Sequence, residues 1–168
     1  MSASLADQPR CLAVALGANL PSPVGAPRQT LLAVRPRLEQ LMAHWAAEPV
    51  QCRWSPLLDT APVGGPADQP TYLNAVLLVD GVHKEPQQQA ALALLDALHR
   101  LEREYGRDRS NEQRWGPRTL DLDFLFWDEL RFEHPRLVLP HPRLHLRSFV
   151  LQPLLAAMQG SVDWGLSA

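Results

Sequence analysis

The sequence has few lysines, few cysteines and no long apolar run, and each shortage excludes a class of protein. Lys84 is the single lysine among 16 basic side chains, and no glycine run precedes it, so the chain has no phosphate-binding P-loop. Cys11 and Cys52 lie far apart and form no CxxC pair, which argues against a zinc site or a disulfide framework. No apolar run approaches the roughly 20 residues of a membrane-spanning helix.

The net charge is also small. A formal charge of −2 argues against a protein that coats nucleic acid through its overall field, so any anion site must be local. The opening stretch MSASLADQPR lacks the charged and apolar regions of a signal peptide, and we expect a cytoplasmic protein. The 168 residues, 46% of them hydrophobic, predict one domain over 1–168, with 1–10 flexible and the chain monomeric.

Apolar patterning and turn residues predict the elements. Strands are predicted at 11–17, about 50–58, 71–80 and 120–127, with a return strand between 130 and 139. Helices are predicted at 27–46, from Pro86 to about Tyr105 with a stop at Gly106, and at roughly 144–158; Pro36 should kink or divide the first. This order predicts an α+β, ferredoxin-like sandwich in which helices cover a mainly antiparallel sheet.

Two aspartates are the first candidate for chemistry. Asp121 and Asp123 are two residues apart on a predicted strand, so both carboxylates project from one face. Leu122, Phe124 and Phe126 are predicted to point to the opposite face. Adjacent carboxylates repel each other unless a cation lies beside them, and Mg²⁺ is the natural cation. The alternative is an exposed face of an edge strand.

Arginines precede this pair in LEREYGRDRSNEQRWGPRT, at positions 103, 107, 109, 114 and 118. A guanidinium group binds two phosphate oxygens at once through two parallel hydrogen bonds. An Mg²⁺ ion held by one or two carboxylates usually completes its coordination shell with water and substrate phosphates. Together the two patterns indicate a nucleoside triphosphate site. The alternative is a solvated loop balanced by neighbouring acidic residues. Trp115 in this loop is either a core anchor or a lid over substrate.

Other candidates have equally plain alternatives. Tyr72 and Asn74 share one face of a predicted strand after the proline- and glycine-rich loop 60–70, where they could stack a flat heterocycle and bond its edge. Ordinary packing explains that pair as well. A histidine in a proline corner, such as His141, is more often structural than catalytic, and Phe149 is typical of a core residue.

Joined together, these segments resemble one enzyme family. The stretches ALGANL, DTAPVGGPADQPTYLNAV, RWGPRTLDLDFLFW and LPHPRLHLRSFVLQPL resemble the 6-hydroxymethyl-7,8-dihydropterin pyrophosphokinases of folate biosynthesis. The resemblance implies a ferredoxin-like fold with three mobile loops. It also implies transfer of pyrophosphate from ATP to the hydroxymethyl group of 6-hydroxymethyl-7,8-dihydropterin, with AMP released. The alternatives are a catalytically silent pterin-binding regulator and an RNA-binding module, although the chain lacks the RGFGFVxF-type motif of the latter.

The resemblance also implies roles for particular residues. Two Mg²⁺ ions would be held by Asp121 and Asp123, which form the catalytic set with Arg109, Trp115 and Arg118. The implied ATP-binding residues are Glu102, Arg107, Arg109, Arg118, Leu137, Val138, His141 and Arg147. The implied pterin-binding residues are Thr60, Val63, Tyr72, Asn74 and Phe149.

The chain departs from the family pattern at a few positions. Ala18 stands where serine is commoner, Ala61 replaces a usual proline, and His99 stands where a glutamine often contacts ATP. The loop 109–115 is one residue longer than in familiar members. These differences bear on individual contacts more than on the reaction class.

Overall fold

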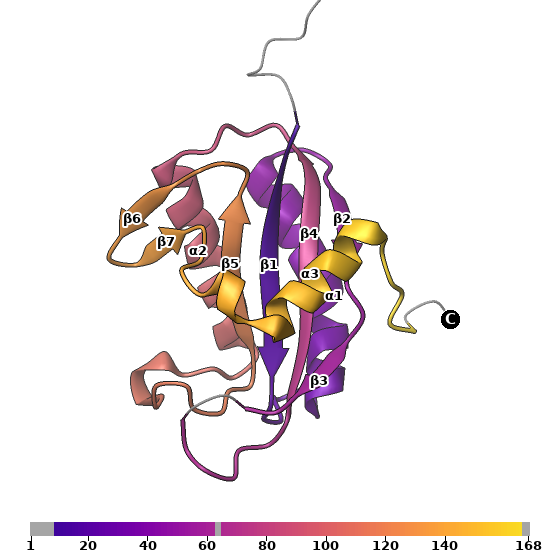
Figure 1. Ribbon diagram of the computed structural model, residues 1–168, viewed down its shortest axis with the longest axis vertical. Helices are drawn as coiled ribbons and strands as arrows, with labels where there is room; N and C mark the ends of the chain where they lie inside the picture. Colours follow the sequence, from indigo (N-terminus) through magenta and orange to yellow (C-terminus); the bar gives the residue numbers. More distant parts are fainter. Residues whose placement is uncertain (1–8, 63–64, 166–168) are drawn as a thin grey trace, which may run out of the picture.

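A computed structural model describes residues 9–62 and 65–165. Figure 1 shows the elements. In chain order they are β1 (Arg10–Ala18), α1 (Pro27–Ala46), β2 (Gln51–Trp54), β3 (Leu58–Thr60), β4 (Tyr72–Val82), α2 (Gln88–Glu104), η2 (Arg109–Asn111), β5 (Asp121–Trp127), β6 (Phe132–His134), β7 (Leu137–Leu139), η3 (Leu144–Leu146) and α3 (Ser148–Gln159). Of the segment predicted to be flexible, residues 1–8 lie outside the described residues, whereas Arg10 already belongs to β1.

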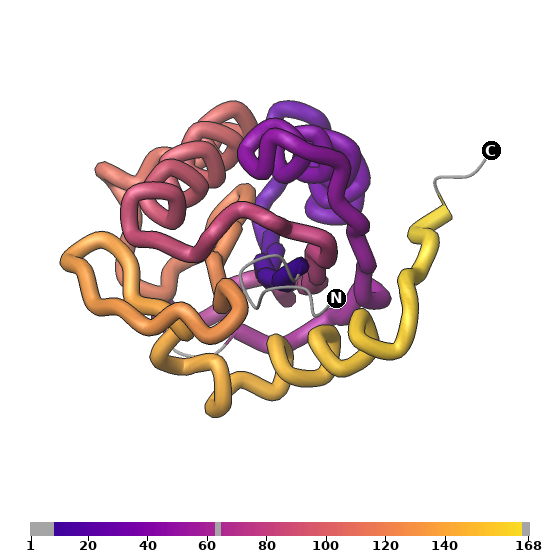
Figure 2. The backbone as a smooth tube through the Cα atoms, turned by 90° about the horizontal axis from the view of Figure 1, so that it is seen from above, coloured from indigo at the N-terminus to yellow at the C-terminus, as the bar shows by residue number. Residues whose placement is uncertain are grey.

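The main sheet is antiparallel and has the strand order β2-β4-β1-β5, with β3 also paired to β4. Seen along the sheet, α1 and α2 cover one face and α3 covers the other (Figure 2). This arrangement confirms the predicted α+β sandwich of ferredoxin-like type. Across residues 9–62 and 65–165, no helix is long and apolar enough to cross a membrane.

Strand alternation divides the core into two layers. On β1, Leu12, Val14 and Leu16 are fully or almost fully buried among the residues of α1 and α2. Their neighbours Ala13 and Ala15 pack instead against α3. Because these neighbours are small, the face of the sheet beneath the start of α3 has room for a ligand. The same alternation places Tyr72 and Asn74 of β4 on that face, as predicted.

Helix α1 shows why its proline does not divide it. The helix is continuous from Pro27 to Ala46, and the residues Leu31, Val34 and Leu38 form its buried stripe. Pro36 lies on the exposed side, where the missing N–H group removes one hydrogen bond without disturbing the packing. The predicted helix is confirmed, and its predicted division at Pro36 is wrong.

Two predicted strands are each split in the structure. The segment predicted as one strand at 50–58 forms β2 and β3, and both pair with β4. Pro56, which cannot donate to a ladder, lies between them. The return strand predicted between 130 and 139 is a separate hairpin of β6 and β7, outside the main sheet. The last predicted helix likewise begins as η3 and continues as α3 after Arg147.

Strand β5 contains an irregularity that alternation alone does not reveal. Ala13 of β1 pairs with Phe126, whereas the next residue, Val14, pairs with Phe124, so Leu125 is an additional residue in the ladder. Leu125 and Phe126 therefore both pack on the α3 side. The prediction that Phe126 shares a face with Phe124 is wrong, but Asp121 and Asp123, which precede the irregularity, keep the predicted alternation.

Candidate active site

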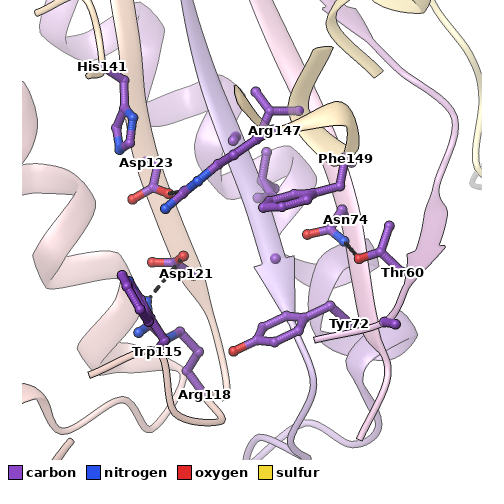
Figure 3. Close-up of a pocket in the computed structure, with 16 residues that line it drawn as sticks. Thr60, Tyr72, Asn74, Trp115, Arg118, Asp121, Asp123, His141, Arg147 and Phe149 are labelled. Atoms are coloured by element: carbon purple, nitrogen blue, oxygen red, sulfur yellow. Dashed lines mark hydrogen bonds and ion pairs between the residues drawn. The ribbon is translucent and has the colours of Figure 1, made fainter. Parts of the chain in front are cut away.

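A cavity of about 220 Å³ opens where β1, β4 and β5 meet the loops 60–71 and 107–120 and the start of α3. Figure 3 shows the side chains around it. Its lining includes most of the residues selected from the sequence: Thr60, Tyr72, Asn74, Trp115, Arg118, Asp121, Asp123, His141, Arg147 and Phe149. Side chains from segments far apart in the chain are thus collected in one pocket.

The two aspartates project into the cavity from adjacent outward positions of β5 (Figure 3). Asp121 accepts a hydrogen bond from Arg107 at 2.7 Å and lies 3.3 Å from a guanidinium nitrogen of Arg118. Asp123 has a more distant partner, Arg147, at 3.7 Å. The positively charged groups therefore lie closer to Asp121 than to Asp123.

This difference in charged neighbours shifts the pKa values of Asp121 and Asp123 in opposite directions. Burial alone would raise the pKa of Asp121, but the guanidinium groups of Arg118 and Arg107 outweigh it and hold the pKa below its ordinary value. Burial, followed by the neighbouring charge of Asp121, raises the pKa of Asp123 to about 7. Two crowded carboxylates of this kind would both be ionised more readily with a cation beside them.

Behind the aspartates lies a buried network of charges. Glu102 of α2 is 0% exposed, and its carboxylate accepts hydrogen bonds from Arg107, Arg109 and the backbone N–H of Leu122. Arg107, which is 5% exposed, also binds Glu112 and Asp121. Burial raises the pKa of Glu102, while the charges of Arg107 and Arg109 act against that increase. The network fixes the orientation of Asp121 from behind.

Aromatic and polar groups form the other half of the cavity. The rings of Phe149 and Tyr72 lie on two sides of an open space, and Asn74 and Thr60 stand at its side (Figure 3). The amide of Asn74 donates to the hydroxyl of Thr60. Asn74 is only 7% exposed, so its amide is held in a fixed orientation. The arrangement is a flat slot with hydrogen-bonding groups along one edge.

Gly17 of β1 forms part of the floor of this slot. A Cβ atom at that position would lie 3.1 Å from the Oδ1 atom of Asn74, which is closer than side chains normally pack. A glycine therefore allows Asn74 to sit directly against the backbone of the central strand. The sequence showed Gly17 only as the end of a predicted strand, and its role depends on the pairing of β1 with β4.

His141 enters the pocket from the loop after β7, with its ring directed toward Asp123 (Figure 3). Its Nδ1 atom accepts a hydrogen bond from the backbone N–H of Arg143, which leaves the proton of the neutral ring on Nε2. Burial, together with the charges of Arg147 and Arg143, lowers the pKa of His141. The residue is therefore a neutral hydrogen-bond donor at pH 7.

Trp115 is 40% exposed, and the guanidinium groups of Arg114 and Arg143 lie over its ring, 4.6 and 4.7 Å from the ring centroid. Its backbone has the left-handed φ angle of 57°. Trp115 also lines the cavity, and its exposure excludes the alternative of a core anchor.

Comparison with known proteins identifies the family. Residues 13–159 match the model of the 7,8-dihydro-6-hydroxymethylpterin-pyrophosphokinases. The chain belongs to this family. It is 43% identical over 141 residues to a 2-amino-4-hydroxy-6-hydroxymethyldihydropteridine pyrophosphokinase of Pseudomonas aeruginosa, a match that covers 84% of this chain and 76% of the relative.

Similar proteins from other bacteria carry the same name. The Haemophilus influenzae protein is 38% identical over 142 residues, which cover 84% of this chain and 77% of the relative. The Bacillus subtilis protein is 34% identical over 146 residues, which cover 87% of this chain and 77% of the relative. These matches extend over most of this chain.

Not every position that the family pattern suggested lies in the cavity. Leu137 and Val138 are in β7, outside the cavity lining, and Arg109 and Glu102, which bond each other, are outside it as well. Arg107 is enclosed by carboxylates. Val63 lies outside the described residues.

The departures from the family pattern can also be placed. Ala61 lines the cavity beside Thr60, and Ala18 is fully buried at the end of β1. His99 is on α2; burial, with the nearby charges of Arg109 and Arg107, lowers its pKa to about 4. His99 is therefore neutral at pH 7, as a glutamine would be, so this replacement adds no charge to the site.

Asn19 is the residue that sequence reasoning missed. It is 2% exposed and immediately follows β1. Its backbone N–H donates to the carbonyl of Arg118, its Oδ1 atom accepts from the Arg118 N–H at 2.8 Å, and its Nδ2 atom donates to the carbonyl of Pro70 at 3.1 Å. In the sequence, Asn19 is visible only as an asparagine directly after a predicted strand. Its role could not be predicted, because its partners lie about 50 and 100 residues away in the chain.

Proposed function

We propose that this cavity transfers pyrophosphate from ATP to the hydroxymethyl group of 6-hydroxymethyl-7,8-dihydropterin and releases AMP, as a step of folate biosynthesis. Membership of the pyrophosphokinase family supports the reaction. The observation that carries the proposal is the presence, in one cavity, of an aromatic slot and a pair of carboxylates flanked by arginines. The slot fits a flat pterin, and the charged half fits a metal-bound triphosphate.

The nucleotide half relies on two arginines with weak internal partners. The side chains of Arg118 and Arg147 are 17% and 23% exposed, and their ion pairs with the aspartates measure 3.3 and 3.7 Å. A phosphate can therefore bind them without breaking a tight salt bridge. Guanidinium groups hold phosphate oxygens in a fixed, two-point geometry. In the proposal, His141 donates a further hydrogen bond to the nucleotide, and adenine lies beside Leu137 and Val138.

The loop residues have supporting roles in this proposal. Trp115 closes over the bound nucleotide, and Arg109, whose side chain is 43% exposed, reaches the phosphates from the same loop. Glu102 holds Arg109 and Arg107 in place. Arg107 acts on the nucleotide through Asp121, because its guanidinium group is already occupied by three carboxylates.

The donor set fits Mg²⁺. No group of three or more histidine, cysteine or acidic side chains among residues 9–62 and 65–165 is arranged to hold an ion alone. Asp121 and Asp123 supply two hard oxygen donors on one face, and phosphate oxygens and water would complete the shell. We propose two ions, held by these two residues, which would neutralise the phosphates and steady the attacking and leaving oxygens.

In the proposed mechanism the pterin slot and the charged nucleotide half of the cavity bring the two reacting atoms together. Phe149 and Tyr72 hold the pterin so that its hydroxymethyl oxygen faces the β-phosphorus of ATP. That oxygen forms a bond to the β-phosphorus, the bond from the β-phosphorus to the bridging α,β oxygen breaks, and AMP leaves with that oxygen. Fixed positioning and charge neutralisation supply most of the rate in transfers of this type. The hydroxyl proton passes to solvent or to a phosphate oxygen.

Asn74 provides a specific test of the pterin half. We expect Asn74→Ala to raise the KM for the pterin roughly 10- to 100-fold, because an unpaired polar group of a buried ligand costs about 1–3 kcal/mol. The KM for ATP should stay within twofold of the wild-type value. Gln89→Ala, a change at an exposed side-chain amide on α2 outside the cavity lining, is the control and should alter neither constant. An unchanged pterin KM in the first variant would contradict the assignment of the slot.

A binding experiment separates an enzyme from a silent pterin-binding protein. The intact protein is titrated with the dihydropterin in a calorimeter, and AMP formation is then measured with ATP and Mg²⁺ in the same buffer. We expect both binding and pterin-dependent AMP formation. Tight pterin binding without AMP would support the regulator, and the absence of both pterin binding and pterin-dependent AMP formation would exclude the proposed function.

A further inference from the structure

A groove between α1 and α2 lies on the side of the sheet opposite to the active-site cavity. The two helices cover the same face of the sheet (Figure 2). Trp45, near the end of α1, donates a hydrogen bond to the carbonyl of Ala90, near the start of α2, at 2.9 Å. Arg37, about two turns earlier in α1, binds Glu104, the last residue of α2. The helices are therefore antiparallel, and the groove of about 600 Å³ runs along both.

The middle of the groove is apolar. Leu41 and Trp45 line it from α1. Three small side chains line it from α2: Ala90, Ala93 and Ala97. Because alanine is short, the groove stays open along the axis of α2. Its lining residues on α1 extend over positions 37–45, about 12 Å of helix, so the apolar face of a third helix two to three turns long matches its shape.

Cationic side chains stand at both ends of this apolar stretch. Lys84, the single lysine of the chain, lies at one end, with its ammonium group 5.8 Å from the centroid of the Trp45 ring. Arg37 and Arg100 lie at the other end. Glu104 is the one carboxylate in the lining, and Arg37 binds it. Three cationic side chains thus meet one carboxylate, in a chain whose net charge is −2.

The acidic side chains around the groove leave two of these cations unpaired. Asp96 feels the charge of Arg100 but is bound by Arg136 of the β6–β7 hairpin. Glu85 follows Lys84 in the chain and is outside the groove lining. Neither Lys84 nor Arg100 forms an ion pair with any residue in 9–62 or 65–165. The groove therefore offers free positive charge at each end.

From this pattern we infer that the groove between α1 and α2 binds an acidic amphipathic helix of a partner protein. Short apolar side chains of that helix lie on the three alanines, and carboxylates two to three turns apart reach Lys84 and Arg100. Helices commonly bind in grooves of this kind by their apolar face. A nucleic acid matches the groove less well, because its phosphates repeat along the whole strand whereas the middle of the groove is apolar.

A designed peptide tests this inference on the intact protein. The probe is a fluorescein-labelled helical peptide of about 15 residues, with leucine and alanine on one face and glutamates bordering that face at each turn. Its counterpart carries lysine at every glutamate position. Fluorescence anisotropy measures both dissociation constants at low salt. We expect the glutamate peptide to bind roughly tenfold or more tightly than the lysine peptide, because charges that match the groove favour one partner and like charges disfavour the other.

Two variants locate the binding site. Arg100→Glu reverses one free charge, and Ala93→Gln fills the floor of the groove from an exposed helical position. We expect each to weaken binding of the glutamate peptide about tenfold. The matched control is Arg103→Glu, the same charge reversal at an exposed position of α2 outside the groove lining, which should bind within twofold of wild type. Thermal melting confirms that each variant is folded.

The outcomes separate the inference from its alternatives. Failure of the glutamate peptide to bind, equal binding of the two peptides, or wild-type binding by both groove variants overturns it. Displacement of the peptide by a 20-nucleotide single-stranded RNA that binds more tightly than the peptide also overturns it, since the groove would then be a nucleic-acid site. None of these results bears on the proposed function, because no groove residue lines the active-site cavity.

Discussion

Replacing Asp123 by asparagine is expected to abolish turnover and, at the same time, to make the ligand-free protein more stable. Turnover should fall roughly 10³-fold or more, because a metal ligand supplies several kcal/mol of charge stabilisation in the transition state. The gain in stability follows from the crowding of carboxylates, since Asp123 lies beside Asp121 and its ion pair with Arg147 measures 3.7 Å.

The sign of the pH dependence follows from the direction of the shift. Burial and Asp121 raise the pKa of Asp123 from its ordinary value of 3.8 to about 7, so the folded state binds a proton that the unfolded state has already released. The free energy of unfolding of the ligand-free protein should therefore decrease as pH rises from about 4 to about 7. Asp123→Asn should remove this contribution. Calorimetric melting at pH 5 and pH 7.5 measures it.

Asp121→Asn is the matched variant for this test. Arg118 and Arg107 hold the pKa of Asp121 low against the effect of burial, so its carboxylate stabilises the fold when ionised. This second variant should lose turnover and stability together. A lower melting temperature for Asp123→Asn at pH 7.5, or measurable turnover near the wild-type rate, would contradict the account of the carboxylate pair.

Replacing Arg107 by alanine is expected to destabilise the protein by about 3–5 kcal/mol, since it leaves buried carboxylates without their cation. The side chain of Arg107 is 3% exposed and pairs with Glu102, Glu112 and Asp121. For a chain of this length the change corresponds to a fall in melting temperature of roughly 6–20 °C. Thermal unfolding without ligand measures it directly.

Arg109→Ala is the control, because Arg109 binds the same Glu102 but is 43% exposed. We expect that variant to melt within a few degrees of the wild-type protein and to bind ATP more weakly. If Arg107→Ala melts like the wild type and loses only ATP affinity, Arg107 contacts the nucleotide directly, as the family resemblance implied, and is not a buried support.

Periodicity and residue type predicted most of the fold and the two side-chain pairs, whereas Thr60, His141, Arg147 and Phe149 were proposed for the site only by the family resemblance. The alternation of strand residues placed Asp121 with Asp123 and Tyr72 with Asn74, and these pairs face one cavity. Strand pairing alone explains why they meet: Gly17 pairs with Asn74 on one side and with Asp121 on the other. Each pair can be recognised in the sequence, but only the pairing of β4 and β5 with β1 places the two pairs at one cavity.

The errors arose where tertiary contacts override local patterns. The extra residue at Leu125 turned Phe126 to the other face, and an exposed position made Pro36 harmless to α1. Arg107 and Arg118 look alike in the sequence, but Arg107 is buried by Glu102 of the preceding helix while Arg118 lines the cavity. The role of Asn19 likewise depends on partners in two distant loops.

The central claim is that the cavity catalyses attack of the pterin hydroxyl on the β-phosphorus of ATP, and product analysis tests it most directly. The intact protein is incubated with ATP and Mg²⁺, with and without 6-hydroxymethyl-7,8-dihydropterin, and the products are separated by ion-exchange chromatography and identified by ³¹P NMR. We expect equal amounts of AMP and pterin diphosphate, and no AMP without the pterin. ADP with a pterin monophosphate, or AMP that forms regardless of pterin, would contradict the claim.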